Sequence, residues 1–288
     1  MRDVRGACAV LVACLFAGGC SDSQTPYSLI AGLRLLGAKS EPAEVAPESR
    51  VALTAYAVDP RGGEFTIDWA ACVDPSIPGT GSVNTDCITV DSAPYLLPLG
   101  EGASIAATVP MLGADLLGGP DATGGVYLPV RLRVFEADAR IDGIYRMRIA
   151  QGGPPNHNPT LASVDDVMAG APLDAGAPTP ERAGAAITLR ASFAPGSAEP
   201  YPAPQPDGTE KPVCETLSVS WFSTAGRFSS DSTGRASDLP ACEGSDDQTD
   251  TVLQLDTAAA PGSVVDLYVV ARDERGGLDF AHRRLVVE

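Results

Sequence analysis

Hydrophobic and polar residues alternate with a period of two along much of the chain, which is the pattern of half-buried β-strands. In the segment FTIDW, Phe65, Ile67 and Trp69 fall on one face, and Thr66 and Asp68 fall on the other. The same alternation returns in VYLPVRLRVF (126–135), AITLRASF (186–193), LSVSW (217–221) and VVDLYVVA (264–271). No long segment has helical spacing, and the best helical candidate is a short turn near 110–117. We therefore predict an all-β chain.

The polar face of segment 126–135 carries two arginines and two aromatic residues. Arg131 and Arg133 are predicted to point away from the apolar face of their strand. Tyr127 and Phe135 also lie opposite that face, and Tyr201 lies in a proline-rich loop, AEPYPAPQPDG. These aromatic residues belong either to a binding face or to a second buried face.

The C-terminal segment predicts a β-hairpin. Alternation in 264–271 is followed by the turn DERGG, in which Gly276 and Gly277 supply positions that tolerate a positive φ. Leu285 and Val287 then resume the alternating pattern at the end of the chain. We expect the final strand to be an integral part of its sheet and not a loose tail.

The length of 288 residues predicts two domains. The segment QGGPPNHNP (151–159) has the composition of a stiff linker and separates 28–150 from 160–288. Each half has the same order: a strand, a tryptophan-bearing strand, a Gly-, Ser- and Asp-rich middle, and two terminal strands. With 30 glycines and 25 prolines the chain favours many turns. The halves therefore form a weak internal repeat.

The N-terminus has the pattern of a secretory signal peptide, which we place at 1–19. Arg2 and Arg5 precede an apolar run, 7–17, that is too short to cross a bilayer. Small residues then lead to Cys20, and polar residues follow it as a tether, 20–27. This arrangement resembles the lipobox of bacterial lipoproteins, which implies that Cys20 is lipidated and anchors the chain to a membrane.

Two alternatives to Cys20 remain open. The lipobox prefers a leucine three residues before its cysteine. The sequence Leu11-Val12-Ala13-Cys14 has this leucine, whereas the residue three positions before Cys20 is Ala17. However, anchoring at Cys14 would leave an apolar run of only about seven residues. The other alternative is an ordinary cleaved signal without lipid.

Four further cysteines are expected to form disulfides. Cys8 and Cys14 would leave with the signal peptide, so an even number remains in the exported chain, which favours disulfides. Their proximity in sequence favours Cys72–Cys87 and Cys214–Cys242, although four cysteines allow three pairings. A metal site is disfavoured because the chain has no CxxC motif and only two histidines.

The chain is acidic, with a formal net charge of −17 and an isoelectric point near 4.4. Such a surface repels phosphate backbones, so nucleic acid is excluded as a partner. Acidic loops could offer oxygen ligands to Ca²⁺, but none has the spacing of a calcium loop, and solvated turns are the simpler interpretation. These loops contain Asp59 and Glu64; Glu243, Asp246, Asp247 and Asp250; and Asp273 and Glu274.

No catalytic residue and no cofactor is predicted. His157 lies in the linker and His282 lies beside arginines in the last strand, and no GxSxG motif supplies a nucleophile for either. Glycine pairs such as those at 118–119 and 124–125 form no phosphate-binding motif. Carboxylates are plentiful, so a glycosidase pair stays open, but no clustered motif supports one.

Three segments resemble Ig-like and PKD-like modules: SEPAEVAPESRVALTAYAVDP, SVSWFSTAGRFSS and VVDLYVVARDERGGLDFAHRRLVVE. They are similar to the first strands, the central tryptophan strand and the closing hairpin of such domains. The chain as a whole resembles bacterial surface lipoproteins that carry tandem Ig-like domains. The resemblance implies two Ig-like antiparallel β-sandwich domains in tandem after a lipoprotein signal peptide.

These observations predict a lipid-anchored protein of the cell envelope, at the outer membrane, that acts as a structural or protein-interaction module. Its partners would be the membrane, through the lipid, and an envelope or extracellular protein or glycan. The alternative is a carbohydrate- or small-ligand-binding module, assisted by Ca²⁺. An enzyme is the third possibility and the least supported.

Overall fold

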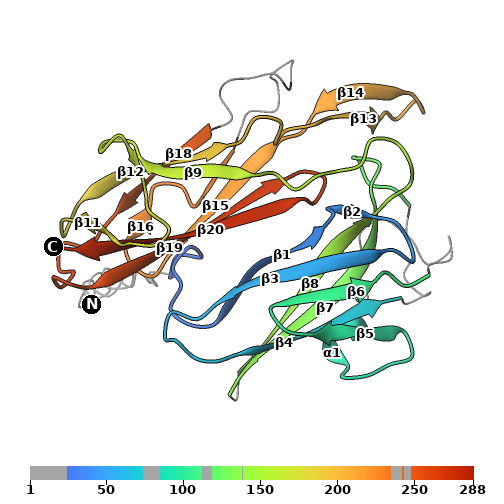
Figure 1. The fold of residues 1–288 in the computed structure, drawn as a ribbon, viewed down its shortest axis with the longest axis horizontal. Helices are drawn as coiled ribbons and strands as arrows, with labels where there is room; N and C mark the ends of the chain where they lie inside the picture. Colours follow the sequence, from blue (N-terminus) through green and yellow to red (C-terminus); the bar gives the residue numbers. More distant parts are fainter. Residues whose placement is uncertain (1–24, 74–84, 112–118, 138, 235–241, 243–247) are drawn as a thin grey trace, which may run out of the picture.

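The computed structural model describes residues 25–73, 85–111, 119–137, 139–234, 242 and 248–288. Within these ranges the chain is all-β, and its single helix is the four-residue α1 (Asp86–Thr89). No described helix has the length and hydropathy needed to span a membrane. The strands form two Ig-like β-sandwiches that lie side by side, one built from the first half of the chain and one from the second (Figure 1).

The first sandwich packs a three-stranded sheet against a five-stranded sheet. The smaller sheet has the order β1 (Arg34–Glu41), β3 (Arg50–Val58) and β6 (Ser104–Thr108). The larger sheet has the order β2 (Glu44–Val45), β8 (Ala139–Ile149), β7 (Val126–Glu136), β4 (Thr66–Cys72) and β5 (Leu96–Glu101). The apolar faces of both sheets meet in one core around Leu53, Trp69 and Leu132.

The second sandwich packs two five-stranded sheets face to face. One has the order β10 (Ala171–Pro172), β9 (Leu161–Asp166), β12 (Ala186–Phe193), β18 (Gln248–Gln254) and β16 (Arg227–Phe228). The other has the order β11 (Thr179–Glu181), β20 (Leu278–Val287), β19 (Val264–Asp273), β15 (Leu217–Ser223) and β17 (Ser232–Gly234). A separate hairpin joins β13 (Pro200–Pro204) to β14 (Glu210–Cys214).

The two sandwiches repeat one topology. In each, the last two strands form an antiparallel pair, the tryptophan strand lies beside the penultimate strand, and a short strand runs parallel to the end of the last strand. Trp69 and Trp221 are fully buried at equivalent places on β4 and β15. A buried tryptophan on the central strand is a feature of Ig-like sandwiches. The repeat expected from sequence is therefore present in the strand order.

The strands predicted from alternation are confirmed. The segments 126–135, 186–193, 217–221 and 264–271 fall on β7, β12, β15 and β19, and residues 66–69 of the first segment fall on β4. The last strand, β20, begins earlier than expected, at Leu278, and both Leu285 and Val287 are buried. In the turn before it, Gly276 has a φ of +99°, which favours glycine.

Some sequence-based expectations need correction. Arg131 and Arg133 leave the sandwich core as predicted, but both are buried, because α1 and the residues after it cover that face of the sheet. Arg133 donates to the carbonyls of Ile88 and Val90 at 2.7 and 2.8 Å. Tyr201 lies on a strand, β13, and is buried. Of the helical candidate near 110–117, residues 112–117 lie outside the described residues, and residues 110 and 111 are not helical.

The two sandwiches share an apolar contact. Ile30, Leu36 and Val58 of the first half pack with Phe222, Tyr268, Val270 and Leu278 of the second. At the edge of this cluster, Tyr56 stacks on Phe280 with ring centroids 4.0 Å apart, and Lys39 lies 3.2 Å from the Asp279 carboxylate. Burial of this shared surface makes the relative placement of the sandwiches a packed arrangement, and segment 151–159 is not the only connection between them.

Candidate functional site

The turn between β19 and β20 reaches a place where both sandwiches and the connecting segment 150–160 meet. We call this place the junction. At its centre is Arg275, whose side chain is only 3% exposed. A buried guanidinium requires partners for its charge and for its N–H groups, so its neighbours define the site.

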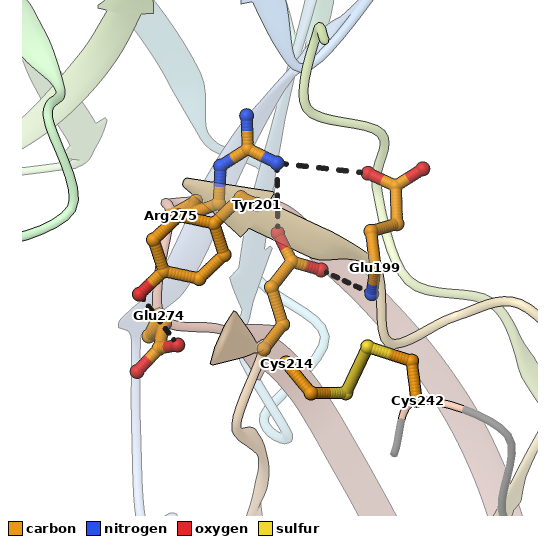
Figure 2. Close-up of a disulfide and its surroundings, with 7 residues drawn as sticks. Glu199, Tyr201, Cys214, Cys242, Glu274 and Arg275 are labelled. Carbon is orange, nitrogen blue, oxygen red and sulfur yellow. Dashed lines mark hydrogen bonds and ion pairs between the residues drawn. A yellow bond between two sulfur atoms is a disulfide. The ribbon is translucent and has the colours of Figure 1, made fainter. Parts of the chain in front are cut away.

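Arg275 bonds to all three parts of the chain that meet here. Its Nη2 donates to Glu44 Oε2 of the first sandwich at 3.3 Å and to the Pro154 carbonyl of the connecting segment at 3.1 Å. Its Nη1 donates to Glu215 Oε1 of the second sandwich at 3.3 Å and lies 3.9 Å from Glu199 Oε2. Figure 2 shows the guanidinium facing Glu199. One side chain thus joins the two sandwiches, which are also linked by apolar packing and by polar contacts such as that of Lys39 with Asp279.

The β13–β14 hairpin covers the junction from one side. The ring of Tyr201 lies 5.2 Å from the Arg275 guanidinium carbon, a cation–π distance, and its hydroxyl donates to Glu274 at 2.9 Å (Figure 2). The Cys214–Cys242 disulfide lies at the end of the same hairpin. The hairpin therefore excludes water from Arg275 and strengthens the ion pairs beneath it.

Glu44 has a second cation partner. Arg148 Nε on β8 donates to the same Glu44 oxygen at 3.0 Å, and both side chains are buried. The backbone N–H of Asn156 also donates to this oxygen, at 3.1 Å. Arg148 is held in turn by Thr123 and by the Tyr127 hydroxyl. Glu44 is therefore the acceptor that ties the connecting segment to the first sandwich.

Asp273 holds the turn that carries Arg275. It accepts the backbone N–H groups of Arg275 and Gly277, each at 2.8 Å, and the amide of Asn156 at 3.4 Å. A side chain at Gly277 would collide with Asp273 and with the His157 carbonyl, which explains the glycine. Two buried atoms of the described junction have no hydrogen-bond partner, Asn156 Oδ1 and Arg275 Nε.

Acidic groups outnumber basic ones at the junction. The carboxylates are those of Glu44, Glu199, Glu215 and Asp273, and the guanidiniums are those of Arg148 and Arg275. Burial, with the nearby charge of Asp273, raises the pKa of Glu215 to about 8. Burial also raises the pKa of the Asp273 carboxyl above its ordinary value. Burial therefore opposes the charged form of both carboxyls.

A groove opens beside the junction, between the two sandwiches, with a volume of about 520 Å³. Its walls are β1, β8 and the β19–β20 turn. Apolar side chains form much of the lining, including Leu35, Leu132, Ile141, Ile144 and Leu278. Four glycines also line it, and at Gly37, Gly143 and Gly277 the side chains of Leu278, Leu35 and Asp273 occupy the space that a Cβ would need.

One wall of the groove is an unpaired strand edge. β8 pairs with β7 over its whole length, but β2 pairs with it only at Arg148 and Ile149. The Ala150 N–H points to β2, where it donates to the Val45 carbonyl at 2.8 Å. Peptide groups alternate sides along a strand, so those of residues 140, 142, 144 and 146 point to the same side. No described backbone group pairs with them there.

The equivalent edge of the second sandwich is covered at its start. On β20, the Leu278 N–H donates to Asn158 Oδ1 of the connecting segment at 2.9 Å. The β13–β14 hairpin is protected differently, by prolines at 200, 202, 204 and 212. The free edge of β8 has neither form of protection along residues 140–146.

The residues singled out from sequence lie at several separate places. Cys20 and Cys14 are outside the described residues. Cys72 and Cys87 lie with Cα atoms 5.9 Å apart and form a disulfide that holds α1 on the first sandwich. Cys214 and Cys242 form a disulfide with a Cα separation of 5.3 Å.

The two histidines lie apart, each beside a carboxylate. His157 Nδ1 is 2.6 Å from Glu199 Oε1, and His282 Nε2 is 2.7 Å from Asp266 Oδ1. Both side chains are substantially exposed. No nucleophile is placed with either of them in the contacts of the described residues.

The acidic loops considered for Ca²⁺ are occupied by internal contacts where the structure describes them. Asp59 accepts from Arg61 and from the Gly63 N–H, and Asp250 forms a two-bond pair with Arg190. Glu243, Asp246 and Asp247 lie outside the described ranges. In the part of the chain that the structure covers, no group of three or more His, Cys, Asp or Glu residues could hold a metal ion.

Sequence reasoning missed the junction. Arg275 lies in the loop with Asp273 and Glu274, for which the sequence favours a solvated turn, and nothing in the sequence singles out Glu44, Asn156 or Glu215. One signal was present, since Asn156 and Asn158 are polar residues without charge in a proline-rich segment, which is typical of a segment whose side chains bond to backbone groups.

Comparison with known proteins finds only remote structural similarities to this chain. No family model matches the chain, and no curated protein matches it. Among solved structures, the three N-terminal domains of the outer capsid protein Hoc of bacteriophage RB49 are similar over 89% of this chain and 70% of theirs, at 12% identity and a TM-score of 0.23. Tandem Ig repeats of Dlar are similar over 90% of this chain and 98% of theirs, at 11% identity and a TM-score of 0.25. The Ig-like assignment made here rests on the strand order of the two sandwiches.

Proposed function

We propose that the mature chain is a lipid-anchored protein of the cell envelope, held at the outer membrane through Cys20, that acts as a protein-interaction module. The sequence around Cys20 supports the anchor, and the even number of remaining cysteines supports export. The two packed sandwiches support a module that holds a binding surface in a defined orientation.

One observation supports the interaction role most directly, the free edge of β8 in the groove between the sandwiches. Unpaired N–H and C=O groups at alternate residues are a template for an extended polypeptide, which adds to the sheet as a further strand. Arg146 adds charge complementarity, because it is 42% exposed and its nearest carboxylate, Asp121, is 4.0 Å away. An extended segment with a carboxylate opposite Arg146 is the partner that this edge would suit.

The groove suits a polypeptide better than a glycan. Sugar sites commonly present aromatic faces, whereas Tyr145 is the only aromatic residue that lines the groove in the described part of the chain. Its hydroxyl is engaged by the Ser40 N–H and lies 2.7 Å from the Ser40 hydroxyl. The apolar lining and the free backbone edge favour main-chain recognition.

Site-specific photo-crosslinking in intact cells tests this proposal. A photo-reactive amino acid in place of Ile144 should form a protein adduct, whereas one in place of Lys211, on the proline-protected hairpin, should not. Ile144→Pro removes an edge N–H without removing a bond to β7, so it should abolish the adduct formed from position 140. Equal adducts at 144 and 211, or an adduct that Ile144→Pro leaves unchanged, would contradict the edge as the binding surface.

A further inference from the structure

The N-terminal segment 26–30 is bound to the second sandwich before the chain enters the first. The Ile30 N–H donates to the Ser223 carbonyl at 2.8 Å, and the Ser223 N–H donates to the Ser28 carbonyl at 2.9 Å, which makes a short parallel bridge at the end of β15. Ser28 and Ile30 are buried, and Ile30 packs with Phe222 in the apolar contact that the sandwiches share. The chain therefore starts on the sandwich that comes second in the sequence (Figure 1, dark blue).

The chain between Cys20 and this bound segment is short. Thr25 is the fifth residue after Cys20, and five fully extended residues span at most about 18 Å. The bound segment is attached at Ser223, which is one end of β15. The other end of β15, Leu217, pairs with Asp273 of the junction and lies ~20 Å further along the strand. A lipid on Cys20 would therefore hold the Ser223 end of the second sandwich nearest to the bilayer.

The loops at the Ser223 end of the second sandwich contain no charged residue. Residues 224–226, which follow β15, are Thr-Ala-Gly, and residues 257–264, which lead into β19, are Thr-Ala-Ala-Ala-Pro-Gly-Ser-Val. Val264 is 48% exposed, and Tyr27 of the bound segment is 69% exposed. Tyrosine rings are favoured at the level of lipid headgroups, and uncharged loops bring no charge that would have to be desolvated there. This end of the molecule therefore suits contact with a lipid surface.

The charged residues nearest to these loops have both signs. Arg227 follows the first loop, Asp256 precedes the second, and Glu288 is exposed beyond the end of β20. In β19, Asp266 Oδ1 lies 2.7 Å from His282 Nε2. The loops themselves add nothing to the net charge of −17, which as a whole would oppose the approach of the chain to an anionic membrane.

We propose that the second sandwich, and not the first, faces the membrane, with loops 224–226 and 257–264 against the lipid surface and the β13–β14 hairpin directed away from it. The turn of that hairpin lies at the opposite end of the second sandwich and exposes Asp207 and Glu210, which anionic lipids would repel (Figure 1). This placement rests on the proposed anchor at Cys20. It reverses the order along the chain, in which the first sandwich follows the anchor.

The first sandwich supplies a surface that should stay away from the lipid. Leu36 and Val58 of its smaller sheet pack on the second sandwich, so the outer face of its larger sheet lies on the far side. The residues after α1 cover that outer face, and Ser92 among them is exposed. If the order along the chain decided the placement, Ser92 would be closer to the lipid than the second sandwich is.

Capture of lipid by a photo-reactive amino acid tests this placement in membranes from cells that make the full chain. At Ala260, in loop 257–264, the photo-reactive group should form lipid adducts on illumination. At Lys211, on the β13–β14 hairpin, and at Ser92 it should form several-fold fewer. All three positions are exposed, so the replacements should leave the fold intact. Mass spectrometry of the captured lipids measures the adducts.

Release of the bound segment supplies a second test. Ile30→Asp places a charge in an apolar contact and should free segment 26–30, so that the chain from Cys20 is held only from β1 onwards. The lipid adduct from Ala260 should then fall several-fold, while Cys20 keeps its lipid. Thr25→Asp makes the same change at an exposed residue just before the bound segment and should leave the adduct unchanged.

The outcomes separate this placement from the anchor on which it rests. Adducts from Ser92 or Lys211 as abundant as those from Ala260, in a chain that carries lipid on Cys20, would overturn the placement alone. An Ala260 adduct that Ile30→Asp leaves unchanged would overturn the role of the bound segment in it. A chain without lipid on Cys20 would overturn the anchor and the placement together. The comparison of the three positions uses the wild-type N-terminal segment, so it stays decisive if Ile30→Asp does not fold.

Discussion

The Nη2 atom of Arg275 donates to Oε2 of Glu44 at 3.3 Å, and the two residues are 231 positions apart in the chain. Both side chains are buried, so neither charge has water as a substitute partner. This pair shows that the two sandwiches are coupled by polar contacts as well as by apolar packing. Each sandwich should therefore stabilise the other, in addition to fixing its orientation.

Replacing Arg275 should lower the free energy of unfolding, and this single change should affect both sandwiches. Arg275→Met leaves Glu44 without one of its cations and removes the partner of Glu215, and breaking a buried pair costs about 3–5 kcal/mol. Denaturant unfolding at pH 7 should show this loss of unfolding free energy. Arg227→Met changes an exposed arginine and serves as control, with an effect within about 0.5 kcal/mol. A loss below 1 kcal/mol in Arg275→Met would contradict the role of the junction.

Deleting residues 285–288 should destabilise the second sandwich sharply. The deletion removes the buried Leu285 and Val287, each worth roughly 1.5–3 kcal/mol, together with the pairing of β20 with β11. Differential scanning calorimetry should show its transition at a much lower temperature. An unaltered melting profile would contradict the placement of the last strand.

The same deletion should also shift the transition of the first sandwich. From the linker composition alone, the first sandwich would be expected to melt unchanged. The structure reverses that expectation, because Leu278 and Phe280 of the same strand pack on Leu36 and Tyr56. Calorimetry of the deletion variant distinguishes the two outcomes directly.

Lipid attachment is predicted at Cys20. Metabolic labelling with an alkyne-bearing fatty acid should mark the wild type and fail to mark Cys20→Ser, which loses the acceptor thiol. The variant should also leave the membrane fraction. Labelling that survives in Cys20→Ser and disappears in Cys14→Ser would move the anchor to Cys14.

Each disulfide should stabilise its own sandwich. The bridges close loops with sequence separations of 15 and 28, for which loop entropy predicts roughly 3–4 kcal/mol each. Peptide mapping without reduction should recover Cys72 with Cys87 and Cys214 with Cys242. Peptides that join the two halves, or free thiols in the exported protein, would contradict this pairing. Cys72→Ser with Cys87→Ser should expose Arg133, which α1 now covers.

The sequence by itself determined the strands and their inward faces. Alternation around Trp69 and Trp221 identified the two central strands, and the glycines at 276 and 277 identified the closing turn. These features are local, because the side-chain direction of a strand residue and the φ of a turn residue depend on a few neighbouring residues. A period of two therefore specifies a strand wherever it occurs.

Only the tertiary structure decided what the polar residues do. Arg131, Arg133 and Arg275 have the sequence context of exposed residues, yet covering segments bury all three. Likewise, β8 and β20 look alike as terminal strands, but on the outer edge of β20 the Leu278 N–H is bonded by Asn158 of the connecting segment. Burial and pairing at these positions depend on groups up to 231 residues away, and no local pattern records which distant surface will dock there.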